Sequence, residues 1–316
     1  MENVPVRTML QHAEKKRRYM NKTELQLLLT ALPFFLLVLV FTYVPLLGWS
    51  MAFVNYIPGV PITESQFVGF KFFKMIFGYG SDLPKAILNT LAMGFLNILV
   101  SPLPMILAIL LNEVRRSKIK RFIQTSVTLP NFISMIIVYS VFFSFLSVDG
   151  GVMNELLLKI GIIKEPLNLL GNSSATWYFQ TFVGVWKTIG WGAIIFLGAI
   201  ASIDTQLYDA ASVDGAGRFR QALHITVPGL MPTFSVLLLL GIGNLLTSNF
   251  EQIYVFHNAL VHDKIETLDY YTYRIGLINF DFSLSTAIGM FKSVISLILL
   301  FSVNLIMKKV NGYSII

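Results

Sequence analysis

Six side chains with hydrogen-bonding groups stand at unusual places in this otherwise apolar chain. Lys187 lies in the middle of one apolar run, Asn131 follows a proline inside another, and the remaining four gather where a third run ends. Amide, carboxylate, ammonium and phenol groups can bind a polar solute through hydrogen bonds without transforming it. We expect the set to line a solute path: Asn131, Lys187, Asn249, Glu251, Gln252 and Tyr254.

The residue patterns typical of enzymes are missing from the sequence. It contains no Gly-x4-Gly-Lys-[Ser/Thr] phosphate-binding loop and no His-Glu-x-x-His zinc motif. Its four histidines lie outside the long apolar runs, and with no cysteine it has neither disulfides nor thiolate metal ligands. We therefore expect no catalytic residue, no metal site and no cofactor on this chain.

The composition suits an apolar solvent. Of the 316 residues, 55% are hydrophobic and only 13% are charged, about half the charged share of a soluble domain. Six stretches are mostly apolar over the roughly 18 residues that a helix needs to cross a hydrocarbon core of ~30 Å. Six such stretches do not fit the alternating faces of a barrel, so we predict an all-α polytopic membrane protein with six transmembrane helices. They cover residues 27–49, 86–111, 121–147, 177–202, 228–249 and 287–307.

The basic residues predict the orientation. Fifteen of the 24 Lys and Arg side chains lie before the first span, after the last, or in the loops that follow the second and fourth spans, against seven in the other loops. Basic loops favour the cytoplasmic side, so both termini are expected there. Membrane lipid headgroups account for the net charge of +7 without any nucleic acid. We divide the chain into a cytoplasmic basic arm (1–25), a transmembrane domain (26–310) and a short tail (311–316).

Two features inside the spans leave alternatives open. Pro130 and Asn131 lie about nine residues into the third span, roughly 14 Å deep at ~1.5 Å per residue. Such a break frees backbone carbonyls, which fits either a water-lined path or a simple packing kink. Lys187 is about 15 Å from the end of its span, too deep to reach water easily, so we expect it to face a polar cavity or a partner. Lys292 is nearer the outer surface and is expected to reach it.

A polar, helix-prone segment, residues 203–228, separates the fourth and fifth spans. Asp204 is a plausible N-cap for a short helix that runs through Val213, and Gly215 then permits a sharp reversal. A second short helix is expected to reach about Thr226, with Pro228 starting the next span. Read from physics alone, this is either an ordinary helical loop or a bent element whose small residues let another surface approach.

The spacing inside this segment resembles the signature loop of ATP-binding-cassette importer permeases. Ala210-Ala211, Gly215, Ile225 and Pro228 match its Glu-Ala-Ala, Gly, Ile and Leu-Pro positions, with Asp209 in place of Glu and Val227 in place of Leu. Other stretches resemble the polysaccharide and oligosaccharide branch of carbohydrate permeases: Leu129–Ser134, Trp186–Gly192, Phe250–Ile253 and Tyr271–Gly276. The resemblance covers nearly the whole chain.

This resemblance implies a fold, a function and partners. The fold would be that of a type I importer permease in a bacterial plasma membrane, working as a heterodimer with a second, homologous permease. Two ATPase subunits would carry ATP and Mg, and an extracytoplasmic lipoprotein would deliver an oligosaccharide. The coupling loop to an ATPase would comprise Asp209, Ala210, Ala211, Asp214, Gly215, Ala216, Arg218, Ile225 and Pro228.

Two alternative functions remain at this stage. The chain could serve an importer of another solute class, because the coupling loop is shared among them. A secondary carrier without an ATPase is disfavoured because none of the six spans contains Asp or Glu, the residues that commonly bind a driving ion. Lys187 suits an acidic sugar such as a uronate, but a single cation does not identify the sugar.

Overall fold

The computed structural model describes residues 22–78, 82–247 and 249–311. Contacts divide the chain into two compact units that meet between Ser50 and Met51. The expected basic arm (1–25) therefore lies outside the described residues up to position 21, and so does the expected tail beyond Asn311.

The first unit is one apolar helical stretch. α1 (Lys22–Val38) continues through a π-helical turn, Leu39–Tyr43, into a 3-10 segment, Val44–Phe53. Residues Leu25–Phe53 are long and apolar enough to cross a membrane, and they include the expected span 27–49. Pro45 has no N–H to donate to the preceding turn, and the helix changes its winding just before it.

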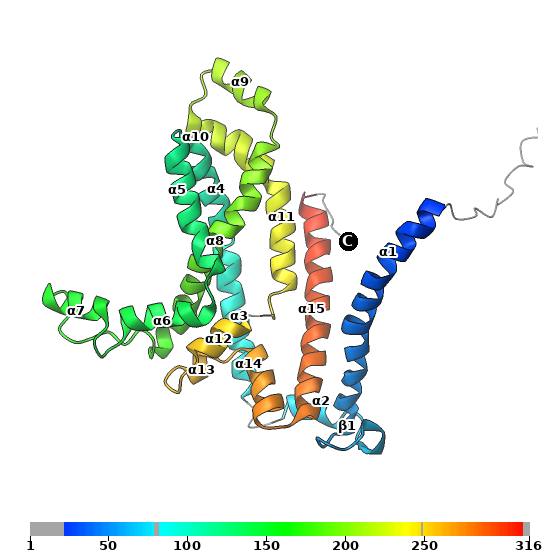
Figure 1. Ribbon diagram of the computed structural model, residues 1–316. Helices are drawn as coiled ribbons and strands as arrows, with labels where there is room; N and C mark the ends of the chain where they lie inside the picture. Colours follow the sequence, from blue (N-terminus) through cyan, green and yellow to red (C-terminus); the bar gives the residue numbers. More distant parts are fainter. Residues whose placement is uncertain (1–21, 79–81, 248, 312–316) are drawn as a thin grey trace, which may run out of the picture. The chain divides into compact units, whose positions relative to one another are not determined.

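The second unit is helical apart from one small two-stranded sheet among its described residues (Figure 1). Strands β1 (Val54–Asn55) and β2 (Gln66–Phe67) pair antiparallel. The α-helices are α2 (Lys71–Ile76), α3 (Leu83–Val100), α4 (Leu103–Glu113), α5 (Ser117–Thr128), α6 (Met135–Leu146), α7 (Val152–Lys159), α8 (Thr176–Ala201), α9 (Thr205–Val213), α10 (Arg218–Gln221), α11 (Val227–Gly243), α12 (Phe250–Phe256), α13 (His262–Ile265), α14 (Leu268–Tyr273) and α15 (Phe282–Asn311).

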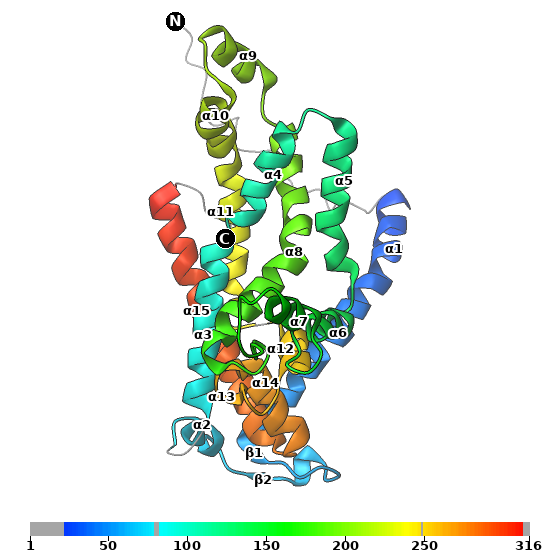
Figure 2. The ribbon, with the colours of Figure 1, turned by 90° about the vertical axis from the view of Figure 1, so that its left-hand side faces the viewer.

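Helix α8 is the centre of this unit. It packs against α3, α4, α5 and α11, and its buried residues contribute to two of the three hydrophobic clusters. Ala193, Phe196 and Ile200, at helical spacing, meet Met105 and Leu230. A third cluster joins α2, α3, α14 and α15. We call the end of the unit that carries α9 the elbow end, and the end that carries α2 and α13 the far end (Figures 1 and 2).

The third expected span, residues 121–147, is not straight. Its two parts, Ser117–Phe132 and Met135–Leu146, meet at a bend of 106°. α5 ends at Thr128, a 3-10 turn (η5, Leu129–Phe132) follows, and the Ser134 hydroxyl caps α6 by accepting from the Ile137 N–H. Figure 1 shows α5 running along the bundle and α6 lying crosswise to it, toward α7. The proline expected to interrupt the span therefore marks a large change of direction.

The helix of the fifth expected span, residues 228–249, begins earlier than the sequence indicated. An unbroken helical stretch runs from Arg218 to Gly243 through a π-helical turn, Ala222–Thr226. Pro228 is consequently inside a continuous helix and does not start one. In a π turn each N–H bonds to the carbonyl five residues back instead of four. This shift in the hydrogen-bond pattern lets the helix continue through Pro228, which has no N–H to donate.

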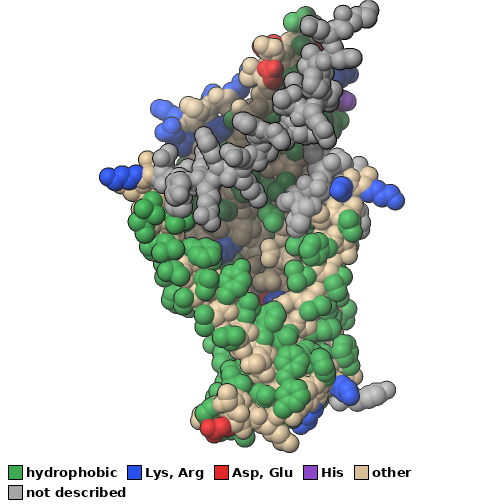
Figure 3. Space-filling model, turned by 90° about the vertical axis from the view of Figure 1, so that its right-hand side faces the viewer, with side chains coloured by type: hydrophobic (Ala, Val, Ile, Leu, Met, Phe, Trp, Pro, Cys, Tyr) green, Lys and Arg blue, Asp and Glu red, His purple; other side chains and the backbone are tan. Residues whose placement is uncertain are grey.

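The other expected spans coincide with long helices. They are Leu83–Glu113, which is broken near Pro102 into α3 and α4, then Ser173–Ala201 and Phe282–Leu305. With the bent pair counted as one, the described residues hold six candidate spans. Many large apolar side chains on these helices are exposed, such as Phe95 at 64% and Leu99 at 65%. Figure 3 shows hydrophobic side chains over much of the visible surface, as an apolar solvent requires.

Candidate functional site

The segment 203–228 forms a bent helical element, which we call the elbow. Asp204 caps α9, because its carboxylate Oδ1 accepts from the Gln206 N–H at 2.9 Å. At the other end of α9, Gly215 has φ +75°, a left-handed conformation that side chains with a Cβ disfavour. The Ala216 N–H reaches the Ala211 carbonyl at 2.8 Å and the Gly215 N–H reaches that of Ser212 at 3.1 Å, a Schellman end.

Side-chain hydrogen bonds hold the two arms of the elbow together. Gln221 donates to the Ser212 hydroxyl at 2.8 Å and to the Ala216 carbonyl at 3.0 Å, and the hydroxyls of Tyr208 and Thr226 lie 2.9 Å apart. These bonds join α9 to the helix that enters the bundle as α11. The position of α9 is therefore tied to that of α11 by defined hydrogen bonds.

The expected coupling residues fall on both arms of the elbow. Asp209, Ala210 and Ala211 are on α9, Asp214, Gly215 and Ala216 form the turn, Arg218 starts α10, Ile225 is in the π turn, and Pro228 is in α11. The Arg218 guanidinium also lies 3.6 Å from the Glu113 carboxylate at the end of α4. A cavity of about 500 Å³ opens between these two helix ends and α9.

Two apolar residues of the elbow were missed by sequence reasoning. Val213 is 88% exposed and Phe219 is 83% exposed, one on each side of the Gly215 turn. Burial of such a pair against a partner removes apolar area from water. The available signal was an apolar residue at each flank of a polar, glycine-containing turn.

A polar pocket lies deeper in the bundle. A cavity of about 150 Å³ between α3 and α11 adjoins a smaller one of about 30 Å³ that reaches α8 and α12, and both are lined by Met93, Asn97 and Asn249. Gln252 is 2% exposed and donates to Gln180 twice, at its backbone carbonyl (2.8 Å) and its side-chain Oε1 (2.7 Å).

Two buried polar atoms that line this pocket have no partner among the described residues, the Ser101 hydroxyl oxygen and the Gln252 Oε1 atom. The Gln252 Oε1 atom makes no hydrogen bond with any described residue. It lies beside Gly184, where an added Cβ would be 3.7 Å from this oxygen and 3.9 Å from the Asn249 amide nitrogen. A buried, unpaired carbonyl oxygen is costly, so the pocket offers a vacant acceptor to a hydroxyl donor.

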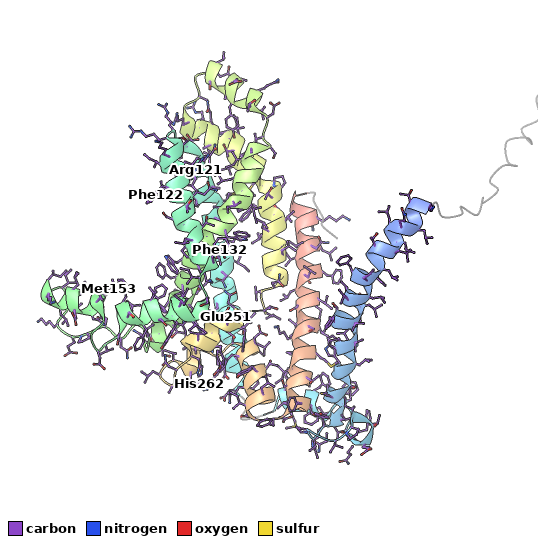
Figure 4. The ribbon with its side chains drawn as sticks, viewed as in Figure 1. Arg121, Phe122, Phe132, Met153, Glu251 and His262 are labelled. Carbon is purple, nitrogen blue, oxygen red and sulfur yellow. The ribbon has the colours of Figure 1, made fainter. Side chains whose placement is uncertain are left out.

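The structure separates the six expected path residues into three places. Asn249 and Gln252 line the pocket. Glu251 (Figure 4) and Tyr254 are on the exposed face of α12. Tyr254 joins an aromatic cluster with Phe250 and Tyr273. Asn131 and Lys187 meet at the bend of the third span, where the Lys187 ammonium donates to the Asn131 carbonyl. The pocket residues Gln180, Thr181 and Asn97 were missed, although each is a polar residue inside an apolar run.

A charged cluster occupies the far end. Arg274 donates to both oxygens of the buried Glu266 carboxylate, at 2.7 and 3.2 Å, and to Asp82 at 3.3 Å. Asp82, His262 and Glu266 have ligand atoms within 4.8 Å of one another, the spacing of a metal site. The guanidinium already satisfies Glu266, so the arginine takes the place that a cation would fill.

Two histidines extend this cluster. The His257 Nε2 and His262 Nδ1 atoms lie 3.0 Å apart, and the His257 ring stacks on Tyr270 at 4.5 Å. Burial, followed by the charges of His262 and Arg274, lowers the pKa of His257. Burial also raises the pKa of Tyr270, with Glu266 adding to the effect. Lys292 of α15 does not reach outward as expected, since it pairs with Asp269 of α14.

These features define the class as a multi-pass helical membrane protein with a polar pocket between its helices and a bent helical element at one end. The model of a family described as "binding-protein-dependent transport system inner membrane component" matches residues 100–312. The chain belongs to this family and is an inner-membrane component of a binding-protein-dependent transport system.

Curated relatives and solved structures agree with this assignment. The chain is 42% identical over 291 residues to protein LplB of Bacillus subtilis (strain 168), covering 91% of this chain and 90% of the relative. It is 41% identical over 301 residues to the polygalacturonan/rhamnogalacturonan transport system permease protein YteP of the same organism, covering 94% and 92%.

Its structure resembles one chain of a bacterial ABC transporter that imports the acidic polysaccharide alginate. The TM-score is 0.83 at 32% identity, covering 92% of this chain and 97% of the other. A second structure, in complex with alginate pentasaccharide-bound periplasmic protein, gives a TM-score of 0.84 and covers 93% and 98%. The type I ABC importer permease fold expected from the resemblance is therefore confirmed.

Proposed function

We propose that this chain is the transmembrane permease subunit of an ATP-driven importer of oligosaccharides. The elbow docks on an ATPase that is a separate polypeptide chain, and the polar pocket forms part of the sugar path. ATP and Mg bind to two such ATPases, so the permease itself catalyses no hydrolysis. A second, homologous permease completes the path, and an extracytoplasmic lipoprotein delivers the sugar. Both termini and the elbow are then cytoplasmic, and the far end faces outward.

The elbow is the observation that carries this proposal. Its Gly215 turn is braced from within, while Val213 and Phe219 project with 88% and 83% exposure. Burying the apolar tip of such a rigid element in a cleft on another protein is more favourable than leaving it exposed to water. Because α9 is bonded to the helix that becomes α11, movement of a docked partner would shift the wall of the pocket.

The pocket supports an uncharged mode of sugar recognition. Its polar lining consists of amides and hydroxyls, including Asn97, Asn249 and Gln252. Sugar hydroxyls are hydrogen-bond donors, and the unpaired Gln252 oxygen is an acceptor without a donor. Names of relatives that refer to polygalacturonan, rhamnogalacturonan and alginate support an oligosaccharide with acidic residues.

The test uses the complex purified from its native membrane and reconstituted in proteoliposomes. We expect uptake of labelled pectic or alginate oligosaccharides to require ATP on the elbow side and the binding protein on the opposite side. Ion gradients should not affect this uptake. Phe219→Ala should reduce ATP-driven uptake several-fold. Phe122→Ala, which removes another highly exposed phenylalanine (73%, on α5), is the matched control and should leave uptake unchanged. Uptake driven by an ion gradient without an ATPase would refute the proposal.

A further inference from the structure

The charged ammonium group of Lys187 donates hydrogen bonds to the protein backbone. Its half-buried ammonium donates to the carbonyls of Pro130 and Asn131, each at 3.3 Å, and to that of Ile133. A lysine ammonium has three N–H donors, so these contacts can engage all of them. The ion pairs found among the described residues all involve other side chains, so the three carbonyls are the partners of this charge.

These carbonyls belong to the bend of the third span. The last carbonyls of a helix lack donors within it, and in an apolar medium an unpaired carbonyl is expensive. At this bend the Pro130 carbonyl also accepts from the Ile133 N–H at 3.2 Å, within the turn itself. Here α5 ends at Thr128 and the 3-10 turn η5 ends at Phe132, after which the chain turns by 106° into α6. A cation also suits the negative end of a helix dipole. The ammonium therefore supplies additional donors at the point where this span is broken.

A second contact of α8 holds the other side of the same bend. Gly190, three residues after Lys187 and hence on the same face of α8, lies directly against the end of α5. A Cβ at this position would be 2.1 Å from the Val127 carbonyl oxygen, which shows how closely the two backbones approach. The rings of Trp186 and Phe142 (5.6 Å) and of Trp191 and Phe132 (5.9 Å) flank the bend.

We propose that Lys187 is a positioning residue that fixes the angle between α5 and α6 by holding the carbonyls at the bend. It acts through the backbone of the third span and does not contact the transported solute. This goes beyond the proposed function, because it assigns the charge to the geometry of the permease and not to recognition of an acidic sugar.

The angle matters because α6 forms part of the surroundings of the pocket. Met135 and Val138 of α6 pack in one cluster with Met93, Val183 and Ile253. Met93 and Ile253 also line the small cavity beside Gln252. A change in the direction of α6 therefore moves the residues that support this wall, and release of Lys187 from the carbonyls would let the third span straighten.

Spin labels can measure this angle directly, since the chain contains no native cysteine. Ser117→Cys at the start of α5 and Ser144→Cys near the end of α6 place labels at exposed positions on the two arms. At ~1.5 Å per residue, arms of about 24 and 17 Å bent by 106° separate the labels by about 25 Å, against about 40 Å for a straight span. The full chain is examined in nanodiscs within its complex, as wild type, Lys187→Met, Lys187→Arg and Lys187→Gln.

The proposal expects a single short distance for wild type and a broadened distribution shifted toward 40 Å for Lys187→Met. Lys187→Arg should restore the short distance, because a guanidinium also offers several donors. Lys187→Gln should be intermediate, and it replaces Lys187→Met if that variant does not fold. Thr188→Ala, whose exposed hydroxyl bonds only the Gly184 carbonyl within its own helix, is the control and should match wild type.

Transport kinetics separate positioning from solute contact. A positioning role predicts a maximal uptake rate several-fold lower in Lys187→Met with the KM for the saccharide unchanged, and recovery in Lys187→Arg. A raised KM with an unchanged label distance would overturn the proposal, as would an unshifted distance in both the methionine and glutamine variants. The distance measurement does not depend on the proposed substrate, so the positioning role can fail while the importer function stands.

Discussion

A pair of glycine substitutions on one helix tests the packing that supports the site. Gly190 and Gly198 are both in α8, yet their surroundings are opposite. At Gly190 an added Cβ would be 2.1 Å from the Val127 carbonyl oxygen, 2.4 Å from its carbon and 2.6 Å from the Thr128 nitrogen. At Gly198 nothing lies within 4 Å of that position. The same chemical change therefore has opposite consequences.

The size of each effect follows from these distances. Ordinary contacts are about 3.5 Å or longer, so at Gly190 the backbones would have to separate by over ~1 Å. Because the clashing atoms are backbone and cannot rotate away, we expect a cost at the upper end of the ~1–3 kcal/mol typical of overpacking. At Gly198 alanine should stabilise the helix by up to ~1 kcal/mol, because alanine loses less backbone conformational entropy than glycine when it enters a helix.

Thermal unfolding of the purified complex in detergent is the assay. At a few degrees per kcal/mol, Gly190→Ala should lower the midpoint by about 5 °C or more, and Gly198→Ala should leave it unchanged or raise it slightly. Gly190→Ala should also shift the α5–α6 label distance, because the lost contact lies at the bend. Equal midpoints for the two variants would mean that α8 does not approach α5 as the structure has it, and the reasoning would fail.

Three further predictions concern the elbow, the pocket and the far end. Gly215→Asn should retain most saccharide-stimulated ATP hydrolysis by the complex, because asparagine tolerates a positive φ, whereas Gly215→Val should lose most of it; equal activities would contradict a conformational role. Gln252→Leu should lower uptake about tenfold or more with the complex intact, since it removes the vacant acceptor, and wild-type uptake would exclude that oxygen from the path. Because the pKa of His257 is lowered in the folded protein, unfolding is favoured as pH falls below the ordinary value of about 6.5. The protection of the α12 and α13 amides against hydrogen exchange, taken relative to the intrinsic exchange rate at each pH, should therefore fall from pH 7.5 to 5. His257→Phe, which keeps the ring on Tyr270, should weaken that pH dependence, and an unchanged profile would assign it to another group.

Local features of the sequence predicted the long apolar helices and the turn of the elbow. A run of apolar side chains long enough for a hydrocarbon core needs no knowledge of distant residues. The same is true of Gly215, since a helix that ends by reversing favours glycine at that point, and the structure gives it a φ of +75°. The Asp204 cap likewise depends on a residue only two positions away.

Features that depend on residues distant in the chain could not be predicted from the sequence. Pro130 announced a break in the third span, but the 106° angle is set by Lys187 and Gly190 of another helix. A charge inside a span suggested a polar cavity or partner, whereas its partners are carbonyls more than fifty residues earlier in the chain. Lys292 was expected to reach the surface, yet Asp269 lies beside it.

The amino-acid sequence by itself determined which segments are long and apolar enough to cross a membrane, where the elbow bends and that the chain lacks the common catalytic motifs. Hydropathy, helix capping and glycine conformation act within a few residues, so they can be read in order along the chain. Only the tertiary structure decided which polar groups meet: Gln252 with Gln180, Arg274 with Glu266 and Asp82, and Lys187 with the bend. The physical reason is that a buried polar group must find a partner wherever packing brings one, and packing joins residues without regard to their separation in sequence.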